Sequence, residues 1–340
     1  MGKKGFTILE LIISIAIFAV VLGIVYFTYT NLLKGSAIET GKAETQLEKI
    51  VGMELLRLDL THVGYGIAKD ETSPIIEWDI GNKILTLRAT LNNTRQETLG
   101  WILVDCSAGC EIVSNSLPLT NRTYYIFFTD VTSRNSVDSG TLNVDDAGIV
   151  TNIEIGNRIN IIPNSYRLLG FPITQEVYTG TANSCDAGYC NMVKYDKTFS
   201  NLPNRCNPNT YKLIRRTGLD AINNLGGDTV IACVADHLVT FDIDSNGDGE
   251  IDMRGYSLPA VDTDGNGVID NYEIRKQLKR MNFYILYQEG VRDLKFKFTN
   301  TVSCGGNQCI GGIDADLVLP PDYINYRWKA IKISVKPMDL

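Results

Sequence analysis

A long apolar segment near the N-terminus constrains this 340-residue chain more than any other feature. Between Phe6 and Tyr29 the one ionisable side chain of consequence is Glu10. The run is long enough to cross a bilayer core of about 30 Å as a helix. Lys3 and Lys4 precede it, so the positive-inside rule places the N-terminus in the cytoplasm and the rest of the chain outside. A cleaved secretory signal has a shorter apolar core.

An acidic side chain inside a membrane helix needs a partner, because it costs at least about 2.5 kcal/mol on insertion scales. If the chain is cut between Gly5 and Phe6, the new α-amino group lies four residues before Glu10, one helical turn away. That amine can pair with Glu10 of its own chain or of a neighbouring chain. The alternative is a plain membrane anchor with an acid near its cytoplasmic end.

The order of basic leader, Gly5, Phe6, Glu10 and apolar helix resembles the processing site of type IV prepilins. The resemblance implies that residues 1–5 are a leader, removed after Gly5 by a prepilin peptidase that methylates Phe6. It implies that Glu10 guides docking into a filament. It makes residues 6–29 the transmembrane and filament-core half of the N-terminal helix.

The helix is predicted to continue as an amphipathic half over residues 30–64. Apolar residues at mostly three- and four-residue spacing predict the buried stripe, namely Ile38, Leu47, Ile50, Val51, Leu55 and Leu58. Glycines at 35, 41 and 52 each weaken a helix by about 1 kcal/mol relative to alanine, and are predicted to mark bends. The stretch 57–66 is similar to the segment that closes the long helix in PilW-type minor pilins, with Thr61 and Val63 departing from that pattern.

The remaining residues, 65–340, predict a β-rich antiparallel head, which makes the fold class α+β and pilin-like. Short strand patterns separated by turn residues include Ile75–Trp78, Lys83–Arg88, Leu99–Val104, Tyr124–Thr129, Arg158–Ile162, Lys212–Arg215, Thr229–Val234, Leu238–Ile243, Asn282–Tyr287, Leu294–Phe298 and Lys329–Val335. The stretch from about 164 to 209 lacks periodicity and is rich in Asn, Gly, Pro and Cys. We interpret about 164–235 as a disulfide-pinned insert.

All eight cysteines follow the membrane segment, which fits an oxidising compartment such as the periplasm. Three pairs are close in sequence, and the last two cysteines pair by elimination. Sequence alone leaves other connectivities open. The predicted disulfides are Cys106–Cys110, Cys185–Cys190, Cys304–Cys309 and Cys206–Cys233. Zinc sites are disfavoured, because the gaps are not the two-residue gaps of zinc ribbons.

Two acidic, glycine-punctuated loops lie between Asp242 and Glu273. Counted from Asp262, the second loop has oxygen donors at positions 1, 3, 5, 9 and 12, and glycine at position 6. With a backbone carbonyl at position 7, this is the pattern of the twelve-residue calcium loop. The predicted Ca²⁺ ligands of the second loop are Asp262, Asp264, Asn266, Val268, Asp270 and Glu273.

The first loop, counted from Asp244, keeps this pattern through position 9, but position 12 is Gly255 in place of the bidentate glutamate. Asp242 is considered as an extra ligand. The predicted ligands of the first loop are Asp244, Asn246, Asp248, Glu250 and Asp252.

The spacing of the two loops excludes a paired EF-hand sensor. The loops start 18 residues apart, and the six residues between them, which include Pro259, cannot hold two helices. We therefore expect Ca²⁺ loops mounted on an extracellular β-rich head, with Kd of roughly 10⁻⁴–10⁻³ M. The alternative is a pair of solvated acidic turns without an ion.

Composition narrows the function classes. The net charge is −7, and no basic stripe lies outside residues 275–280, so nucleic acid is not an expected partner. The chain has two histidines, His62 and His237, and neither has a nucleophile nearby in sequence. We expect no catalytic site.

The resemblance implies a minor pilin of a type IV pilus, most similar to the PilW type. It implies an inner-membrane precursor with a periplasmic head, followed by an extracellular position at the pilus tip. The expected partners are major and minor pilins, prepilin peptidase and a tip adhesin. Two alternatives are a J-like pseudopilin of type II secretion and a calcium-dependent adhesive pilus subunit.

Overall fold

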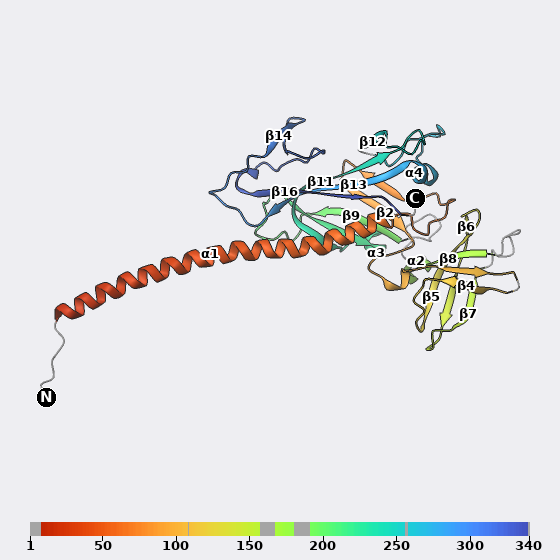
Figure 1. Ribbon diagram of the computed structural model, residues 1–340, viewed down its shortest axis with the longest axis horizontal. Coiled ribbons are helices and arrows are strands. Elements are labelled where there is room, and N and C mark those ends of the chain that lie inside the picture. The colour runs from red at the N-terminus through yellow and green to blue at the C-terminus, as the bar shows by residue number, and fades with distance from the viewer. Residues whose placement is uncertain (1–7, 108, 157–166, 180–190, 256–257, 339–340) are drawn as a thin grey trace.

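A single long helix projects from a head built on two β-sheets (Figure 1). The computed structural model describes residues 8–107, 109–156, 167–179, 191–255 and 258–338. Helix α1 (Ile8–Thr61) has 54 residues, about 81 Å at 1.5 Å per residue. It curves gently and stays helical through Gly35, Gly41 and Gly52, so these glycines do not break it.

The larger sheet is antiparallel and has the strand order β1-β2-β9-β10-β11-β13-β16, with β12 paired to β11. Its long central strands are buried along most of their length, because α1 packs against β11 and touches β13 and β16. The strands are β1 (Ile76–Asp79), β2 (Ile84–Ala89), β9 (Asn191–Thr198), β10 (Tyr211–Thr217), β11 (Asp228–Ile243), β12 (Met253–Gly255), β13 (Leu278–Glu289) and β16 (Arg327–Val335).

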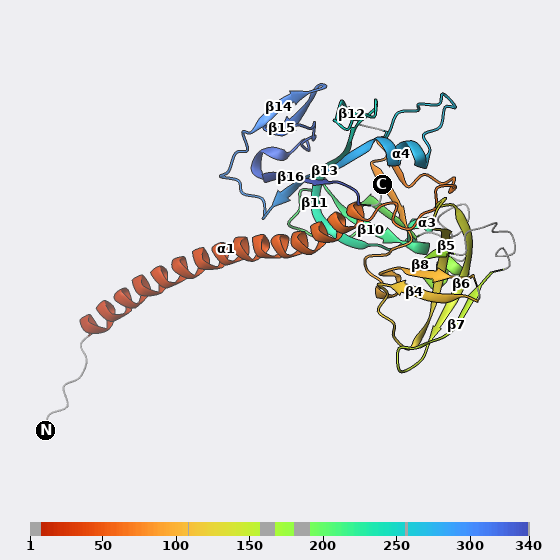
Figure 2. The ribbon, with the colours of Figure 1, turned by 45° about the vertical axis from the view of Figure 1, so that its right-hand side comes forward.

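The second sheet has the order β4-β3-β8-β5-β6-β7 and its own apolar core. Figures 1 and 2 show it beyond the C-terminal end of α1. Its strands are β3 (Ile102–Asp105), β4 (Glu111–Asn115), β5 (Arg122–Asp130), β6 (Ser136–Val144), β7 (Val150–Ile155) and β8 (Arg167–Ile173). Strand β6 largely alternates buried and half-buried residues, as expected for a sheet with one covered face.

Short elements complete the described part of the chain. They are the hairpin β14 (Thr301–Cys304) and β15 (Asn307–Ile310), the helices α2 (Gln175–Tyr178), α3 (Gly218–Asn223) and α4 (Asn271–Gln277), and the 3₁₀ turns η1 (Gln96–Thr98) and η3 (Tyr323–Asn325). The antiparallel head on a long N-terminal helix is the predicted α+β, pilin-like class.

The predicted buried face of the second half of α1 is wrong. Ile50 and Val51 are 64% and 73% exposed, and Leu55 and Leu58 are half-buried. The side chains of Ile38 and Leu47 lie outside the described residues. The face that packs against the sheet carries instead Gly52, Leu56, Asp59 and Leu60. Apolar periodicity missed it because this face includes a glycine and an acid.

The predicted insert at about 164–235 is also wrong. Strand β8 lies inside the second sheet, between β3 and β5, and strands β9 and β10 lie inside the larger sheet. The segment therefore supplies interior strands to each of the two sheets. Residues 294–298 are not a strand, and the patterns 229–234 and 238–243 form one continuous strand, β11. The predicted strand 158–162 lies outside the described residues.

Candidate functional site

The N-terminal half of α1 exposes an apolar surface that nothing else in the described chain covers. The span Leu11–Leu33 is long and apolar enough to cross a membrane, and none of it is buried against the head. The predicted processing residues Gly5 and Phe6 lie outside the described residues. Glu10 lies within α1, and its side chain is also outside them. An apolar surface of this size needs lipid or other subunits around it.

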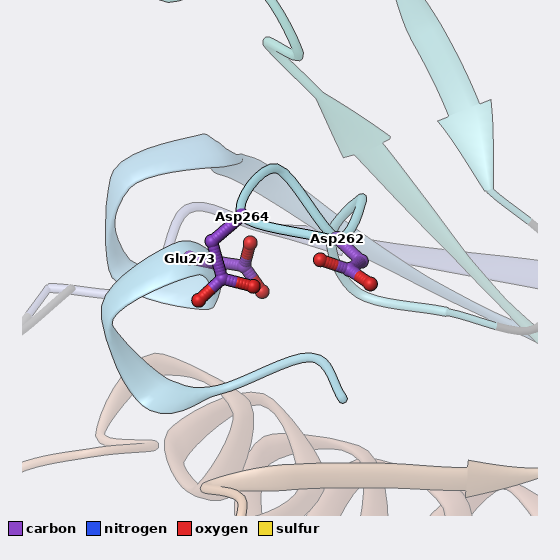
Figure 3. Close-up of side chains that lie close together, drawn as sticks. All are labelled: Asp262, Asp264 and Glu273. Carbon is purple, nitrogen blue, oxygen red and sulfur yellow. The ribbon is translucent and has the colours of Figure 1, made fainter. Parts of the chain in front are cut away.

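The second acidic loop brings three carboxylates together. One carboxylate oxygen from each of Asp262, Asp264 and Glu273 lies within 4.8 Å of the other two (Figure 3). Glu273 is buried in the first turn of α4, whereas Asp264 is exposed on the loop. Carboxylate oxygens in a twelve-residue loop are the donor set that Ca²⁺ prefers, and these three residues could hold one ion.

Backbone hydrogen bonds shape this loop around its first residue. Asp262 accepts from the N–H groups of Gly265 and Gly267, both at 2.7 Å. These bonds lower the pKa of Asp262. Burial acts to raise the pKa of Glu273, but bonds from the Thr263 N–H and hydroxyl and from the Asp270 N–H together lower it. Both carboxylates are therefore ionised at neutral pH, the form that a cation requires.

The remaining predicted ligands of the second loop have other roles in this structure. The Asp270 carboxylate caps α4 by accepting from the Glu273 N–H at 2.8 Å. The Asn266 side-chain oxygen accepts from the Val268 N–H at 2.7 Å. Asn266, Val268 and Asp270 are all exposed. Glu273, at position 12, both ends the loop and lies in the first turn of α4.

The first acidic loop connects β11 to β12 and differs in its electrostatics. Asp244 is 1% exposed and accepts from the N–H groups of Gly247 at 2.6 Å and Gly249 at 2.9 Å. Its Oδ2 also lies 3.0 Å from Nζ of Lys279. Burial acts to raise the pKa of Asp244, but the bonds from Lys279 and the two glycines lower it. An internal cation therefore already pairs with the residue at position 1.

The other acids of the first loop do not converge. Asp252 accepts from the Ser245 N–H at 3.1 Å and from its hydroxyl at 2.9 Å. Asp242, considered as an extra ligand, pairs instead with Nε of Arg254 at 3.0 Å. Asn246, Asp248 and Glu250 are exposed. Within the described residues, the close group of three acids is found in the second loop and not in the first.

Helix α4 links the second loop to the segment that follows α1. The Asn271 side chain accepts from the Ile75 N–H at 2.8 Å and donates to the carbonyls of Glu71 at 2.8 Å and Ser73 at 2.9 Å. Asn271 is 3% exposed, so these bonds are shielded from water. A change in the loop that moves α4 therefore moves the chain between α1 and β1.

Sequence reasoning missed a buried ion pair between α1 and the larger sheet. Asp59 accepts from Nε of Arg215 at 2.6 Å and from its Nη2 at 3.1 Å. Tyr195 donates to the same carboxylate at 2.5 Å, and Asn93 donates at 2.7 Å. Asp59 and Arg215 are 5% and 2% exposed. The signal was an acid among apolar residues near the end of the helix.

The buried histidine is a structural residue of the larger sheet. The His237 ring stacks on Phe283, and its Nε2 lies 2.9 Å from the Lys83 carbonyl. A carbonyl only accepts, so Nε2 carries the proton and Nδ1 accepts from the Tyr211 hydroxyl at 2.7 Å. Burial and the charge of Lys83 lower the pKa of His237 to about 3.

Three of the four predicted disulfides are present in the described residues: Cys106–Cys110, Cys206–Cys233 and Cys304–Cys309. The fourth predicted pair, Cys185–Cys190, lies outside those residues. Cys206–Cys233 ties the segment before β10 to the middle of β11.

Comparison with known proteins identifies the N-terminal segment. Residues 1–26 match the family described as the prokaryotic N-terminal methylation motif. This match supports a type IV pilin-like protein. The match covers the predicted leader and about the first third of α1, and the head lies outside it. No curated protein and no solved structure matches the chain significantly.

Proposed function

We propose that this pilin is a minor subunit of a type IV pilus, of the PilW type, which enters the filament through α1. The methylation motif followed by an uncovered apolar half-helix supports this proposal most directly. The prepilin waits in the inner membrane with its head in the periplasm, and prepilin peptidase cuts after Gly5. The mature helix then packs among the helices of other major and minor pilins.

The size of the head favours a position at the filament tip, in the complex that primes assembly and supports adhesion. Two sheets and a projecting hairpin, gathered around the C-terminal part of α1 and beyond its end, make a bulky head (Figure 1). Such a head suits a filament end better than many closely packed copies along a shaft.

Intact-mass spectrometry of sheared filaments tests the pilus assignment. We expect a chain that starts at methylated Phe6, at trace stoichiometry against the major pilin. An uncut chain confined to the membrane fraction would contradict the proposal. Recovery as the dominant species would make the chain the main building block instead, and dependence of recovery on secretion genes would favour the pseudopilin alternative.

We also propose that Ca²⁺ binds the second loop and stabilises the head. Asp262, Asp264 and Glu273 would hold the ion, with the carbonyl of Val268 at position 7. The first loop would bind more weakly, because Lys279 competes for Asp244. At 10 mM Ca²⁺ and a Kd of 10⁻⁴–10⁻³ M, the head gains about 1.4–2.7 kcal/mol. At about 2–4 °C per kcal/mol, Tm rises by roughly 3–10 °C.

The calcium experiment uses the full chain in detergent, melted in Ca²⁺ and in EGTA. We expect Ca²⁺ to raise Tm for the wild type and for Asp228→Asn, which removes an exposed acid at the start of β11. Asp262→Asn and Glu273→Gln should lose that rise. An equal Tm in Ca²⁺ and EGTA, or a full rise in Glu273→Gln, would refute the calcium proposal.

A further inference from the structure

A cavity of about 430 Å³ lies where three parts of the head meet. The turn after α1 forms one wall, and β5 and β8 of the second sheet form another. Helix α4, which packs on the core of the larger sheet, contributes a third. The residues that line it are Gly64, Tyr65, Gly66, Ile67, Lys69, Thr129, Arg134, Phe171 and Arg275. The volume lies in the usual range for small-molecule sites.

Three cations line this cavity, and none of its nine lining residues is an acid. Such a concentration of positive charge is unexpected in a chain with a net charge of −7. Lys69 and Arg134 come from different segments, and the Lys69 N–H donates to the Arg134 carbonyl at 3.0 Å. In the described part of the chain, neither Lys69 nor Arg134 forms an ion pair. Their charges are therefore available to an external anion.

Two backbone carbonyls hold Arg275 at the cavity wall. Its Nη2 donates to the carbonyls of Ile67 at 3.0 Å and Gly64 at 3.3 Å. The preceding residue, Ile274, is fully buried in the core and holds α4 in place. These two carbonyls orient the guanidinium. A guanidinium positioned in this way is suited to a planar oxyanion.

The same cavity has an apolar wall. Tyr65 and Phe171 meet edge to face with ring centroids 5.2 Å apart, and the Tyr65 hydroxyl donates to the Gly100 carbonyl at 3.1 Å. Gly66 has φ +69°, and a Cβ there would lie 2.7 Å from the Phe171 ring. Glycine thus allows the backbone to lie against the aromatic pair. A ligand needs both a charged group and a body that covers this wall.

We propose that this cavity binds a small organic acid, with its carboxylate between Lys69, Arg134 and Arg275 and its body against Tyr65 and Phe171. A bare inorganic oxyanion would fill only a small part of about 430 Å³ and would leave the aromatic wall wet. A sugar acid has such a carboxylate, together with a ring that can lie against the aromatic wall. The inference concerns a ligand of the head, so its failure leaves the pilin proposal intact.

Isothermal titration of the full chain in detergent tests the proposal with D-glucuronate, D-glucose and inorganic phosphate at constant ionic strength. We expect D-glucuronate to bind at least tenfold more tightly than D-glucose, which lacks the carboxylate. Phosphate should compete with D-glucuronate for the three cations. Equal binding of the two sugars, or no competition by phosphate, would overturn the proposal.

Charge-neutralising variants locate the binding. Lys69→Gln and Arg134→Gln should each weaken D-glucuronate binding at least tenfold. Arg134 has φ 62°, and glutamine has a similar backbone preference, so this change adds no strain. Arg122→Gln is the matched control, because Arg122 is exposed on β5 and does not line the cavity. Equal weakening by Arg122→Gln, or full binding by both cavity variants with unchanged Tm, would overturn the proposal.

Discussion

Gly52 is the position where the packing of α1 and the intrinsic preference of a helix make opposite predictions. An alanine in the interior of a helix is favoured over glycine by about 1 kcal/mol. At Gly52, however, α1 lies directly on β11, and a Cβ would overlap the Val230 carbonyl oxygen. It would also lie 2.8 Å from the carbonyl carbon and 2.9 Å from Cα of Val230.

The expected magnitude follows from what the added methyl would meet. Real Cβ atoms essentially never approach other heavy atoms closer than 3.0 Å, and here the obstacles are backbone atoms of a central strand. Neither element can rotate away as a flexible side chain would. Overpacking of this kind costs about 1–3 kcal/mol, which exceeds the helix preference. Gly52→Ala should therefore destabilise the head by up to about 2 kcal/mol net, and lower Tm by about 2–4 °C per kcal/mol.

The assay is thermal unfolding of the full chain in detergent, followed by tryptophan fluorescence. Trp78, Trp101 and Trp328 all lie in the head, so the signal reports head unfolding. Gly35→Ala is the control, since a Cβ there meets nothing within 4 Å. It should not lower Tm. A Gly52→Ala protein as stable as the wild type would refute the close packing of α1 on β11.

Two further predictions concern buried polar groups of the larger sheet and of the helix packed on it. Asp59→Asn leaves Arg215 buried without its counter-charge, so it should lower the free energy of unfolding in urea by about 3–5 kcal/mol. Adding Arg215→Met to the same chain should restore part of this loss. A loss below about 1 kcal/mol in Asp59→Asn would contradict the ion-pair account. The second prediction concerns His237, which the unfolded chain protonates below about pH 6.5 and the folded chain only near pH 3. The free energy of unfolding should therefore fall as the pH drops below about 6.5, by no more than about 1.4 kcal/mol per pH unit. His237→Gln should lack this loss between pH 6.5 and 4.5, and an identical pH profile in both proteins would contradict it.

The parts of the fold that sequence predicted well are those with a single dominant physical signal. The apolar run of α1 predicts a helix, the alternation of β16 predicts a strand, and the short apolar run of β5 predicts another. The acidic loops were located because liganding residues and glycines repeat at fixed spacing. Two of the observed disulfides were predicted because their cysteines are near in sequence, with glycines between them that allow a tight turn. The third, Cys206–Cys233, was predicted by elimination.

The remaining features depend on contacts between residues far apart in the chain. Asp59 and Arg215 are 156 residues apart, and nothing local marks either as the partner of the other. The sequence of strand β9 has no clear periodicity, yet the strand pairs with β2 and β10 inside the larger sheet, and its first half is mostly buried. The cavity of Lys69, Arg134 and Arg275 combines three segments that carry no shared motif. Periodicity cannot reveal such sites, because it reports the local environment alone.

The way α1 attaches to the head explains why a glycine and an acid lie at this interface. An apolar stripe alone tolerates sliding or rotation of a helix, because hydrophobic contact is not directional. Asp59 must meet Arg215 and Tyr195, and Gly52 must meet Val230; a shift of one residue turns a helix by about 100° and breaks both contacts. The head is thus held at one rotation and one height on α1. In a filament built from such helices, the position of α1 would therefore fix the direction in which the head faces.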